Sequence, residues 1–379
     1  MDQTTFAGLF QAYQDSCRGT QQLPDLTVSA GRYDAPIVLL IHGIGGNVQH
    51  WTDPVGLNPN DTWLFDLSAT PTQRRGLAMS PPYQRDQITP WGDFLRGQEI
   101  SWVTWSQAQA NDRIEYAVAE AVRVLSALEQ GVFAPYRDDV AINGGTVPPL
   151  IILCHSRGGL VARGALKQVG GVGVPHLVRV ITLCTPHQGS YMPQLAAAYN
   201  GLLKNELDFS TLGDNLPGPL RAMFERRLES GVASLANQVR NALSHSFGTL
   251  AQSPGFDELA PDSAMLRALM DGEQPLPGVE YVAFGGSQPT FVHFYLCEAG
   301  RAFHLLATAS AFLVEQLSRI PGVGSAFGGL AELSLGDSAV SLTSSHWPEA
   351  FGANHQVASV NHMQALVDSS LQQAVRRLL

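Results

Sequence analysis

The sequence predicts an α/β protein built on a mostly parallel, doubly wound sheet. Short apolar runs typical of buried strands alternate with helical segments, and glycine-rich or polar turns follow several of these runs. Such alternation favours right-handed crossovers between parallel strands. We therefore expect the functional groups to gather where the strands end, at their carboxyl edge.

The first half of the chain supplies most of this pattern. A strand is expected at 36–41, where it runs into His42-Gly-Ile-Gly-Gly46, and a second at 99–105. A helix is predicted over 111–130, because apolar residues recur there at helical spacing. Those apolar residues are Ile114, Val118, Val122, Leu125 and Leu128. The next strand begins at Leu150 and breaks at a serine and two glycines, after which a helix follows.

The second half alternates less regularly. Strands are expected at 177–184 and 279–284, and a last one at 355–360 leads to a C-terminal helix from Met363 onward. Two long blocks, residues 190–278 and 287–334, interrupt this order. The first has helical patterning between about Leu220 and Leu243, and the second is expected to be helical and glycine-rich. We expect one domain over 1–379 with both blocks as candidate cap or lid insertions, the alternative being ordinary peripheral helices.

Composition limits the classes of partner. Charged residues make up 15% of the 379 residues, below the roughly 25% of an average soluble protein. The net charge is −10 and no basic cluster is present, which argues against nucleic acid because phosphate backbones are bound by clustered Lys and Arg. The sequence leaves the oligomeric state unknown.

Localisation signals and cysteine motifs are both lacking. The four cysteines have no CxxC spacing, so neither a zinc site nor a disulfide framework is indicated.

The first residues lack the basic and apolar regions of a signal peptide, which predicts a cytoplasmic protein, or a secreted one if a signal has been removed. The longest apolar stretch, 303–314, is too short for a bilayer span.

Ser156 is the candidate nucleophile. The segment Leu150-Ile-Ile-Leu-Cys-His-Ser-Arg-Gly-Gly159 predicts a strand, a sharp turn and a helix with Ser156 at the apex. A serine hydroxyl is a poor nucleophile unless a base activates it. A sharp turn at a helix N-terminus exposes the hydroxyl and offers backbone NH groups that can hold an oxyanion. This turn therefore predicts a serine hydrolase.

A base and an acid are expected at later strand ends. His362 follows the last predicted strand and gives the chain order serine, acid, histidine. Asp337 lies in a turn between a strand and that histidine, although a glycine-aspartate pair is often only a turn. The alternatives are His355 and His346 for the base, and Asp262 and Glu280 for the acid.

The oxyanion hole is expected to combine two backbone NH groups. One belongs to Arg157, directly after the nucleophile, and the other to Ile44 in the glycine-rich loop. Neither GxGxxG nor a GK[ST] ending is present, so a phosphate-binding role for this loop is disfavoured. His42 is expected to pack under the loop.

The motifs together resemble the α/β-hydrolase superfamily. They are His42-Gly-Ile-Gly-Gly46, His155-Ser-Arg-Gly-Gly159, Thr185-Pro-His-Gln-Gly-Ser190, Gly336-Asp337 and Asn361-His362. They are similar to those of bacterial triacylglycerol lipases and lipase-like carboxylesterases, including the inositol-deacylase-like branch. Residues 256–269 also resemble a segment of the cap region of these enzymes.

The resemblance has departures. Cys154 occupies the place where the family usually has glycine, two residues before the serine. The block before Asp337 is longer than expected. Some of these lipases bind a structural calcium, but no paired aspartates could be matched, so the metal stays unassigned and no cofactor is expected.

The expected activity is therefore hydrolysis of a hydrophobic acyl ester through an acyl-enzyme on Ser156. The expected partner is a small-molecule or lipid-like ester substrate, with interfacial contact with lipid as a further option. Alternatives that keep the same three residues are an acyltransferase, a thioesterase or an amidase, because the acceptor is chosen by cap loops. A catalytically silent hydrolase fold used as a binding module is a further alternative.

Overall fold

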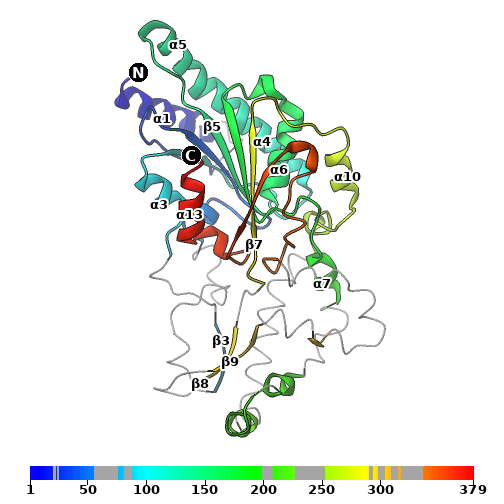
Figure 1. The fold of residues 1–379 in the computed structure, drawn as a ribbon. Coiled ribbons are helices and arrows are strands. Elements are labelled where there is room, and N and C mark those ends of the chain that lie inside the picture. Colours follow the sequence, from blue (N-terminus) through cyan, green and yellow to red (C-terminus); the bar gives the residue numbers. More distant parts are fainter. Residues whose placement is uncertain are drawn as a thin grey trace.

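The computed structural model contains a central seven-stranded sheet flanked by helices (Figure 1). It describes residues 1–19, 23, 25–54, 76–80, 88–198, 208–214, 216–226, 252–289, 293–297, 304–308, 315–316 and 336–379. The strand order is β1-β4-β2-β5-β6-β7-β10, and every neighbouring pair is parallel except β1 with β4. The predicted mostly parallel sheet is thereby confirmed.

Six strands of this sheet coincide with the predicted apolar runs to within a few residues, and the short edge strand β1 was not predicted. They are β1 (Thr27–Ser29), β2 (Ile37–Ile41), β4 (Ser101–Thr104), β5 (Leu150–His155), β6 (Leu177–Leu183), β7 (Glu280–Gly286) and β10 (Asn354–Ala358). Every residue of β2 and β5 is buried, as expected for parallel strands covered on both faces.

Helices and helical turns connect and cover the strands. The α-helices are α1 (Gln3–Gly19), α2 (Gln49–Thr52), α3 (Trp91–Gly97), α4 (Ile114–Leu128), α5 (Ala134–Asn143), α6 (Gly158–Val169), α7 (Met192–Ala198), α9 (Pro254–Asp257), α10 (Ala264–Met270) and α13 (Ser369–Arg376). Shorter turns are the π-helical η3 (Glu129–Phe133) and the 3₁₀ turns η4 (Gly171–Gly173), η6 (Phe209–Gly213), η8 (Glu349–Phe351) and η9 (Gln364–Leu366). Residues 218–226 are also helical.

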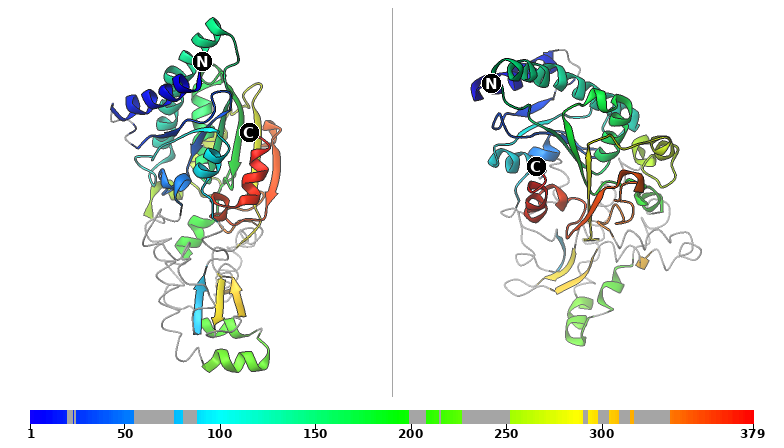
Figure 2. Two further views of the ribbon diagram at one scale, coloured as in Figure 1. Left: turned by 90° about the vertical axis from the view of Figure 1, so that its left-hand side faces the viewer. Right: turned by 45° about the horizontal axis from the view of Figure 1, so that its top comes forward.

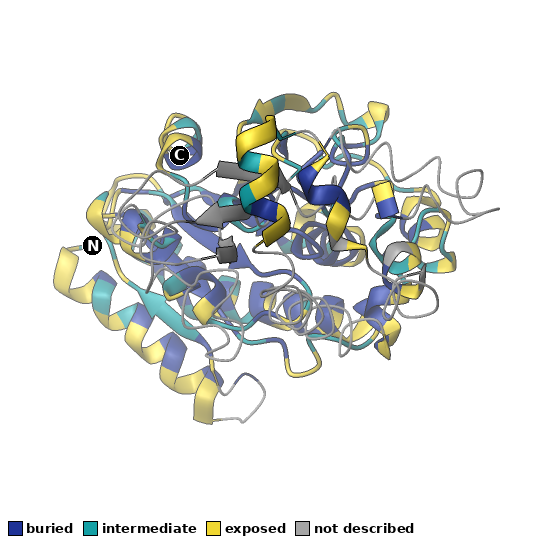
Figure 3. Cartoon of the chain, turned by 90° about the horizontal axis from the view of Figure 1, so that it is seen from below, coloured by how far each residue is buried: buried dark blue, intermediate teal, exposed yellow. Residues whose placement is uncertain are grey.

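Two apolar clusters fill the two sides of the sheet. Successive residues of β2 alternate between them, because side chains along a strand point to opposite faces: Leu39 belongs to one cluster and Leu40 to the other. Helices α1, α4 and α6 contribute to the first cluster, and α2, α3 and α13 to the second. Figure 3 shows the buried strands between helices whose outer surfaces are exposed.

A second, three-stranded antiparallel sheet has the order β3-β8-β9. It joins β3 (Gly76–Ser80) to β8 (His293–Cys297) and β9 (His304–Thr308). In Figures 1 and 2 it lies on the side toward which α7 and the carboxyl end of β7 extend. The expectation of a helical block over 287–334 is therefore wrong at its two strands. Short apolar runs have no period that separates strand from helix, and the pairing partner β3 is distant in the sequence.

One predicted boundary also differs. The C-terminal helix begins at Ser369, not at Met363. Asp368 explains the difference, since its side chain caps the helix by accepting from the Leu371 NH at 2.8 Å.

Much of the two candidate cap blocks lies outside the described residues, including most of the helix predicted between Leu220 and Leu243. The described part of block 190–278 is helical or irregular. Within the described ranges, no helix combines the length and the apolar character that crossing a bilayer requires.

Candidate active site

Ser156 lies on a tight turn between β5 and α6. Its φ is +54°, a left-handed conformation that costs free energy for any residue other than glycine and is typical of a strained nucleophile turn. The neighbouring glycines permit this close packing. A Cβ on Gly158 would lie 2.2 Å from the Ile41 carbonyl oxygen, and one on Gly43 would lie 2.8 Å from the Ser156 Cβ.

Cys154, the departure from the family pattern, fits in this turn without displacing the serine. It is the fifth residue of β5, where it pairs in register with Ile41 of β2 and Thr182 of β6. Its side chain is buried in the first apolar cluster. Burial raises the pKa of this thiol well above its usual value, so Cys154 is a neutral core residue.

The structure brings Ser156, His362 and Asp337 together. The Ser156 hydroxyl lies 2.8 Å from His362 Nε2, and His362 Nδ1 lies 2.8 Å from Asp337 Oδ2. A carboxylate only accepts hydrogen bonds, so Nδ1 carries the proton and Nε2 is free to accept from the serine. The His362 NH also donates to the Asp337 carbonyl at 3.0 Å, which ties the two residues together through the backbone.

Asp337 is completely buried and its other oxygen is occupied. Oδ1 accepts from the NH groups of Ala339 at 2.8 Å and Val340 at 2.7 Å. These two bonds leave Oδ2 as the oxygen that faces His362, so the carboxylate has one defined orientation.

The two predicted oxyanion donors border the serine. Arg157 follows Ser156 directly, and Ile44 is adjacent to Gly43, whose backbone packs against the serine side chain. The hydrogen bonds of the described backbone give no acceptor to the NH of either Ile44 or Arg157. Helix α6 begins at the next residue, so its N-terminal dipole adds positive potential at this point.

The Arg157 side chain has a separate contact. It is buried and donates to the Asp112 carbonyl at 2.7 Å and to Gln107 Oε1 at 2.9 Å. Burial lowers the pKa of this guanidinium to about 10, which leaves it charged at neutral pH. The side chain therefore fixes the 107–112 loop beside the turn.

The alternative candidates lie away from this constellation. His355 is on β10 and stacks on His346, with ring centroids 4.2 Å apart. Glu280 forms an ion pair with Arg179 at the surface. The Asp262 carbonyl accepts from Arg267 at the start of α10.

Three side chains of the described residues group closely enough to suggest a metal site. They are Cys184, Asp337 and His362, whose ligand atoms lie within 4.8 Å of one another. Burial, followed by the Asp337 charge, raises the pKa of the Cys184 thiol well above its usual value. A protonated thiol is a poor metal ligand, and the other two residues already bond each other.

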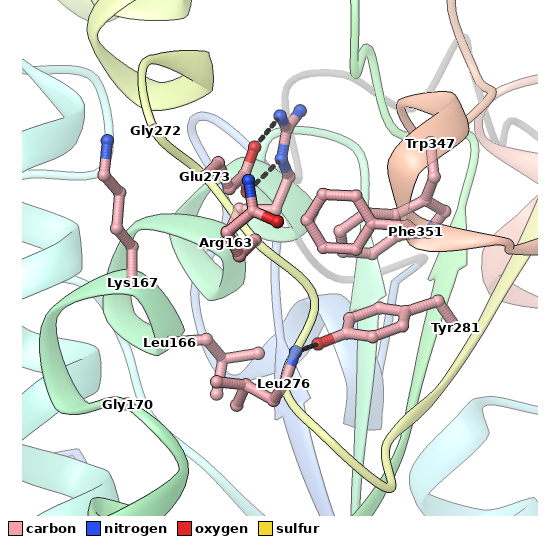
Figure 4. Close-up of a pocket in the computed structure, with 11 residues that line it drawn as sticks. Arg163, Leu166, Lys167, Gly170, Gly272, Glu273, Leu276, Tyr281, Trp347 and Phe351 are labelled. Atoms are coloured by element: carbon pink, nitrogen blue, oxygen red, sulfur yellow. Dashed lines mark hydrogen bonds and ion pairs between the residues drawn. The ribbon is translucent and has the colours of Figure 1, made fainter.

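The Thr-Pro-His segment supports the turn and a neighbouring pocket. Thr185 donates to the Ser156 carbonyl at 2.8 Å, and the His187 ring packs against Trp347 at a tilt of 35°. Arg163 donates to the His187 carbonyl at 3.0 Å and pairs with Glu273. Figure 4 shows this ion pair on one wall of a cavity of about 210 Å³, with Tyr281, Trp347 and Phe351 along another.

Sequence reasoning missed a pair of histidines that contacts the backbone carbonyl of His362. His50 lies 2.8 Å from His155, which in turn lies 2.8 Å from the His362 carbonyl. His155 adjoins the serine, but no local pattern marks His50. Only the fold brings these rings together.

Comparison with known proteins gives matches among solved structures only. Neither a protein-family model nor a curated protein sequence matches the chain. The mature form of Bacillus licheniformis lipase BlEst2 matches at TM-score 0.45 and 15% identity, covering 93% of this chain and 96% of that one. The hydrolase olei00960 of Oleispira antarctica matches at TM-score 0.40 and 13% identity, over 97% and 96%. The metagenomic carboxyl esterase MGS0156 matches at TM-score 0.39 and 9% identity, over 88% and 66%.

The fold itself is recognisable from topology. A mostly parallel sheet has one antiparallel edge strand, β1, and the sharp serine turn follows the central strand β5. Late in the chain, β7 and β10 complete the sheet beside β6. The chain therefore has the α/β-hydrolase fold.

Proposed function

We propose that this protein is a serine carboxylic-ester hydrolase. One observation carries the proposal: Ser156, His362 and Asp337 form a continuous hydrogen-bonded set at the carboxyl edge of the sheet. This arrangement supplies a nucleophile, a base and an orienting acid in the geometry that acyl transfer requires.

The reaction follows from the direction of these hydrogen bonds. Ser156 Oγ attacks the acyl carbonyl while His362 Nε2 takes its proton, and Asp337 stabilises the resulting imidazolium. The NH groups of Ile44 and Arg157 hold the tetrahedral oxyanion. The carbon–oxygen bond to the alcohol then breaks, and His362 returns the proton to the leaving oxygen.

The second half of the cycle repeats the first with water. His362 Nε2 takes a proton from water, and the hydroxide attacks the acyl group on Ser156. The serine leaves with the proton from His362, which releases the carboxylic acid. The low content of charged residues supports a hydrophobic acyl group and contact with a lipid surface.

The test compares p-nitrophenyl esters of increasing acyl length with wild-type protein, Ser156→Ala and Ser126→Ala. Ser126 lies on the exposed side of α4 and serves as the matched control. We expect Ser156→Ala alone to lose ester hydrolysis and labelling by a fluorophosphonate. Full activity in Ser156→Ala would refute the mechanism. A wild-type protein that reacts with neither ester nor probe would indicate a silent binding module.

The same experiment separates the related activities. Faster turnover of a thioester or an amide than of the matched ester would assign a thioesterase or an amidase. Preferential transfer of the acyl group to an added alcohol over water would assign an acyltransferase.

A further inference from the structure

Two buried histidines connect α2, which follows β2, to the backbone carbonyl of His362. His50 of α2 and His155 at the end of β5 are joined by a 2.8 Å contact between Nε2 and Nδ1. His155 Nε2 then lies 2.8 Å from the carbonyl oxygen of His362. The ring centroids are 4.9 Å apart for the first pair and 4.7 Å apart for His155 with His362. We call His50 and His155 the histidine relay.

The contacts fix which nitrogen carries each proton. A carbonyl oxygen only accepts, so His155 Nε2 must carry a proton and donate it to His362. A neutral His155 then has a bare Nδ1, which accepts from a protonated Nε2 of His50. Burial is the main cause that lowers the pKa of both rings well below its usual value, which keeps the relay neutral.

His42 completes the same packing on the side of the glycine-rich loop. Its Nε2 accepts from the Gln107 NH at 3.1 Å, so its Nδ1 carries the proton and contacts the Gly43 carbonyl at 2.8 Å. A Cβ on Gly46 would lie 2.7 Å from His42 Nδ1 and 2.9 Å from His50 Nδ1. Glycine is therefore required where this loop covers the rings.

We propose that the histidine relay positions His362, so that its Nε2 stays aligned with the Ser156 hydroxyl during turnover. This inference rests on the proposed function, because it treats His362 as the base. The relay touches neither substrate nor the reacting atoms. It acts by donating one hydrogen bond to the His362 carbonyl, in addition to the bond that Asp337 makes to the ring.

A neutral relay also matters electrostatically. The titratable groups that face it are His42 from the loop after β2 and His362 from the loop after β10. The Arg157 guanidinium of the serine turn acts on His42. Added charge on the relay would oppose the imidazolium that forms at His362. It would also place two N–H donors face to face across the 2.8 Å contact between His50 and His155.

The test uses His155→Phe, His155→Gln and the control His355→Gln. The glutamine amide can still donate to the His362 carbonyl, whereas phenylalanine fills the space without a donor. His355 is a histidine on β10 outside the relay, stacked on His346. Active sites are counted by fluorophosphonate titration of Ser156, so that unfolded protein does not lower the measured kcat.

We expect His155→Phe to lower kcat about 10- to 100-fold per titrated site, because a shift of about 1 Å in a catalytic group has effects of that size. KM should stay within about twofold, and His155→Gln should recover most of the loss. Equal kcat per site in wild type and His155→Phe would overturn the proposal, as would equal loss in His155→Gln and His155→Phe.

A second measurement does not depend on activity. Imidazole ¹⁵N spectra of the wild type should show neutral His50 and His155 rings with the proton on Nε2, assigned by loss of the signals in His50→Gln and His155→Gln. A proton on Nδ1 of His155 would overturn the relay even in an active enzyme. If the wild type neither hydrolyses esters nor reacts with the probe, the proposed function fails and the positioning role fails with it, while the spectra report separately on the tautomers.

Discussion

Replacing Asp337 with asparagine gives the sharpest test of the assigned acid. In the wild type, Oδ1 accepts two NH groups, from Ala339 and Val340, and Oδ2 accepts from His362 Nδ1. An asparagine amide has one acceptor and one donor end. Directing the donor end at the two NH groups would leave them unsatisfied, at a cost of about 1–3 kcal/mol each.

Asparagine will therefore place its oxygen on the two NH groups and its NH₂ toward His362. The histidine must then accept at Nδ1 and carry its proton on Nε2, where it can no longer take the serine proton. The same tautomer error in a serine protease lowers kcat about 10⁴-fold, which corresponds to about 5.5 kcal/mol at ~1.4 kcal/mol per tenfold.

The assay is hydrolysis of a short p-nitrophenyl ester near pH 8, with the melting temperature as a check on folding. Asp257→Asn is the control, because Asp257 is an exposed carboxylate on α9. We expect a loss of about 10³- to 10⁴-fold in kcat for Asp337→Asn and none for the control. Retention of a tenth or more of the wild-type kcat would refute the tautomer argument.

Three further predictions concern stability and the serine turn. Burial lowers the pKa of His42 from 6.5 to about 4. Between pH 6.5 and pH 4 the unfolded chain therefore binds more protons at this residue than the folded protein does. The free energy of unfolding should fall by about 3 kcal/mol from this group as the pH falls through that range. Gly43→Ala should lower kcat at least about tenfold, because its Cβ would lie 2.8 Å from the Ser156 Cβ. Glu273→Ala should cost about 3–5 kcal/mol of stability, since it leaves the buried Arg163 without its partner.

Each of these has a direct measurement. Urea unfolding midpoints at pH 7 and pH 4.5 test the histidine prediction, and equal midpoints would contradict it. Ester hydrolysis tests Gly43→Ala against Gly171→Ala, whose Cβ would meet no atom within 4 Å; equal kcat for both variants would exclude the steric argument. Urea unfolding also tests Glu273→Ala, and the double change Arg163→Met with Glu273→Leu should recover most of the lost stability if burial of an unpaired charge is the cause.

The strands of the central sheet were predictable because their signal is local. A run such as 36–41 is apolar throughout and is shorter than a typical buried helix, which favours a strand covered on both faces. The small sheet was not predictable by this route. Its strand β3 pairs with β8 more than two hundred residues later, and a short apolar run carries no information about so distant a partner.

The candidate site divides in the same way. Ser156, Asp337 and His362 could be chosen from the sequence because each follows a strand or turn whose position is readable, and the structure places them within hydrogen-bonding distance. His50 could not be chosen. Its environment is made by β5 and by the loop after β10, so its burial and its contact with His155 exist only in the folded chain.

The separation of the three residues along the chain sets the order in which the site is assembled during translation. His362 is synthesised 206 residues after Ser156 and 25 after Asp337. A ribosome-bound chain can therefore form the serine turn and the glycine-rich loop long before an acid or a base exists to activate the hydroxyl. Under the proposed mechanism, Ser156 is not activated until the segment that carries His362 has joined the fold, and acquisition of probe reactivity during synthesis would report that moment.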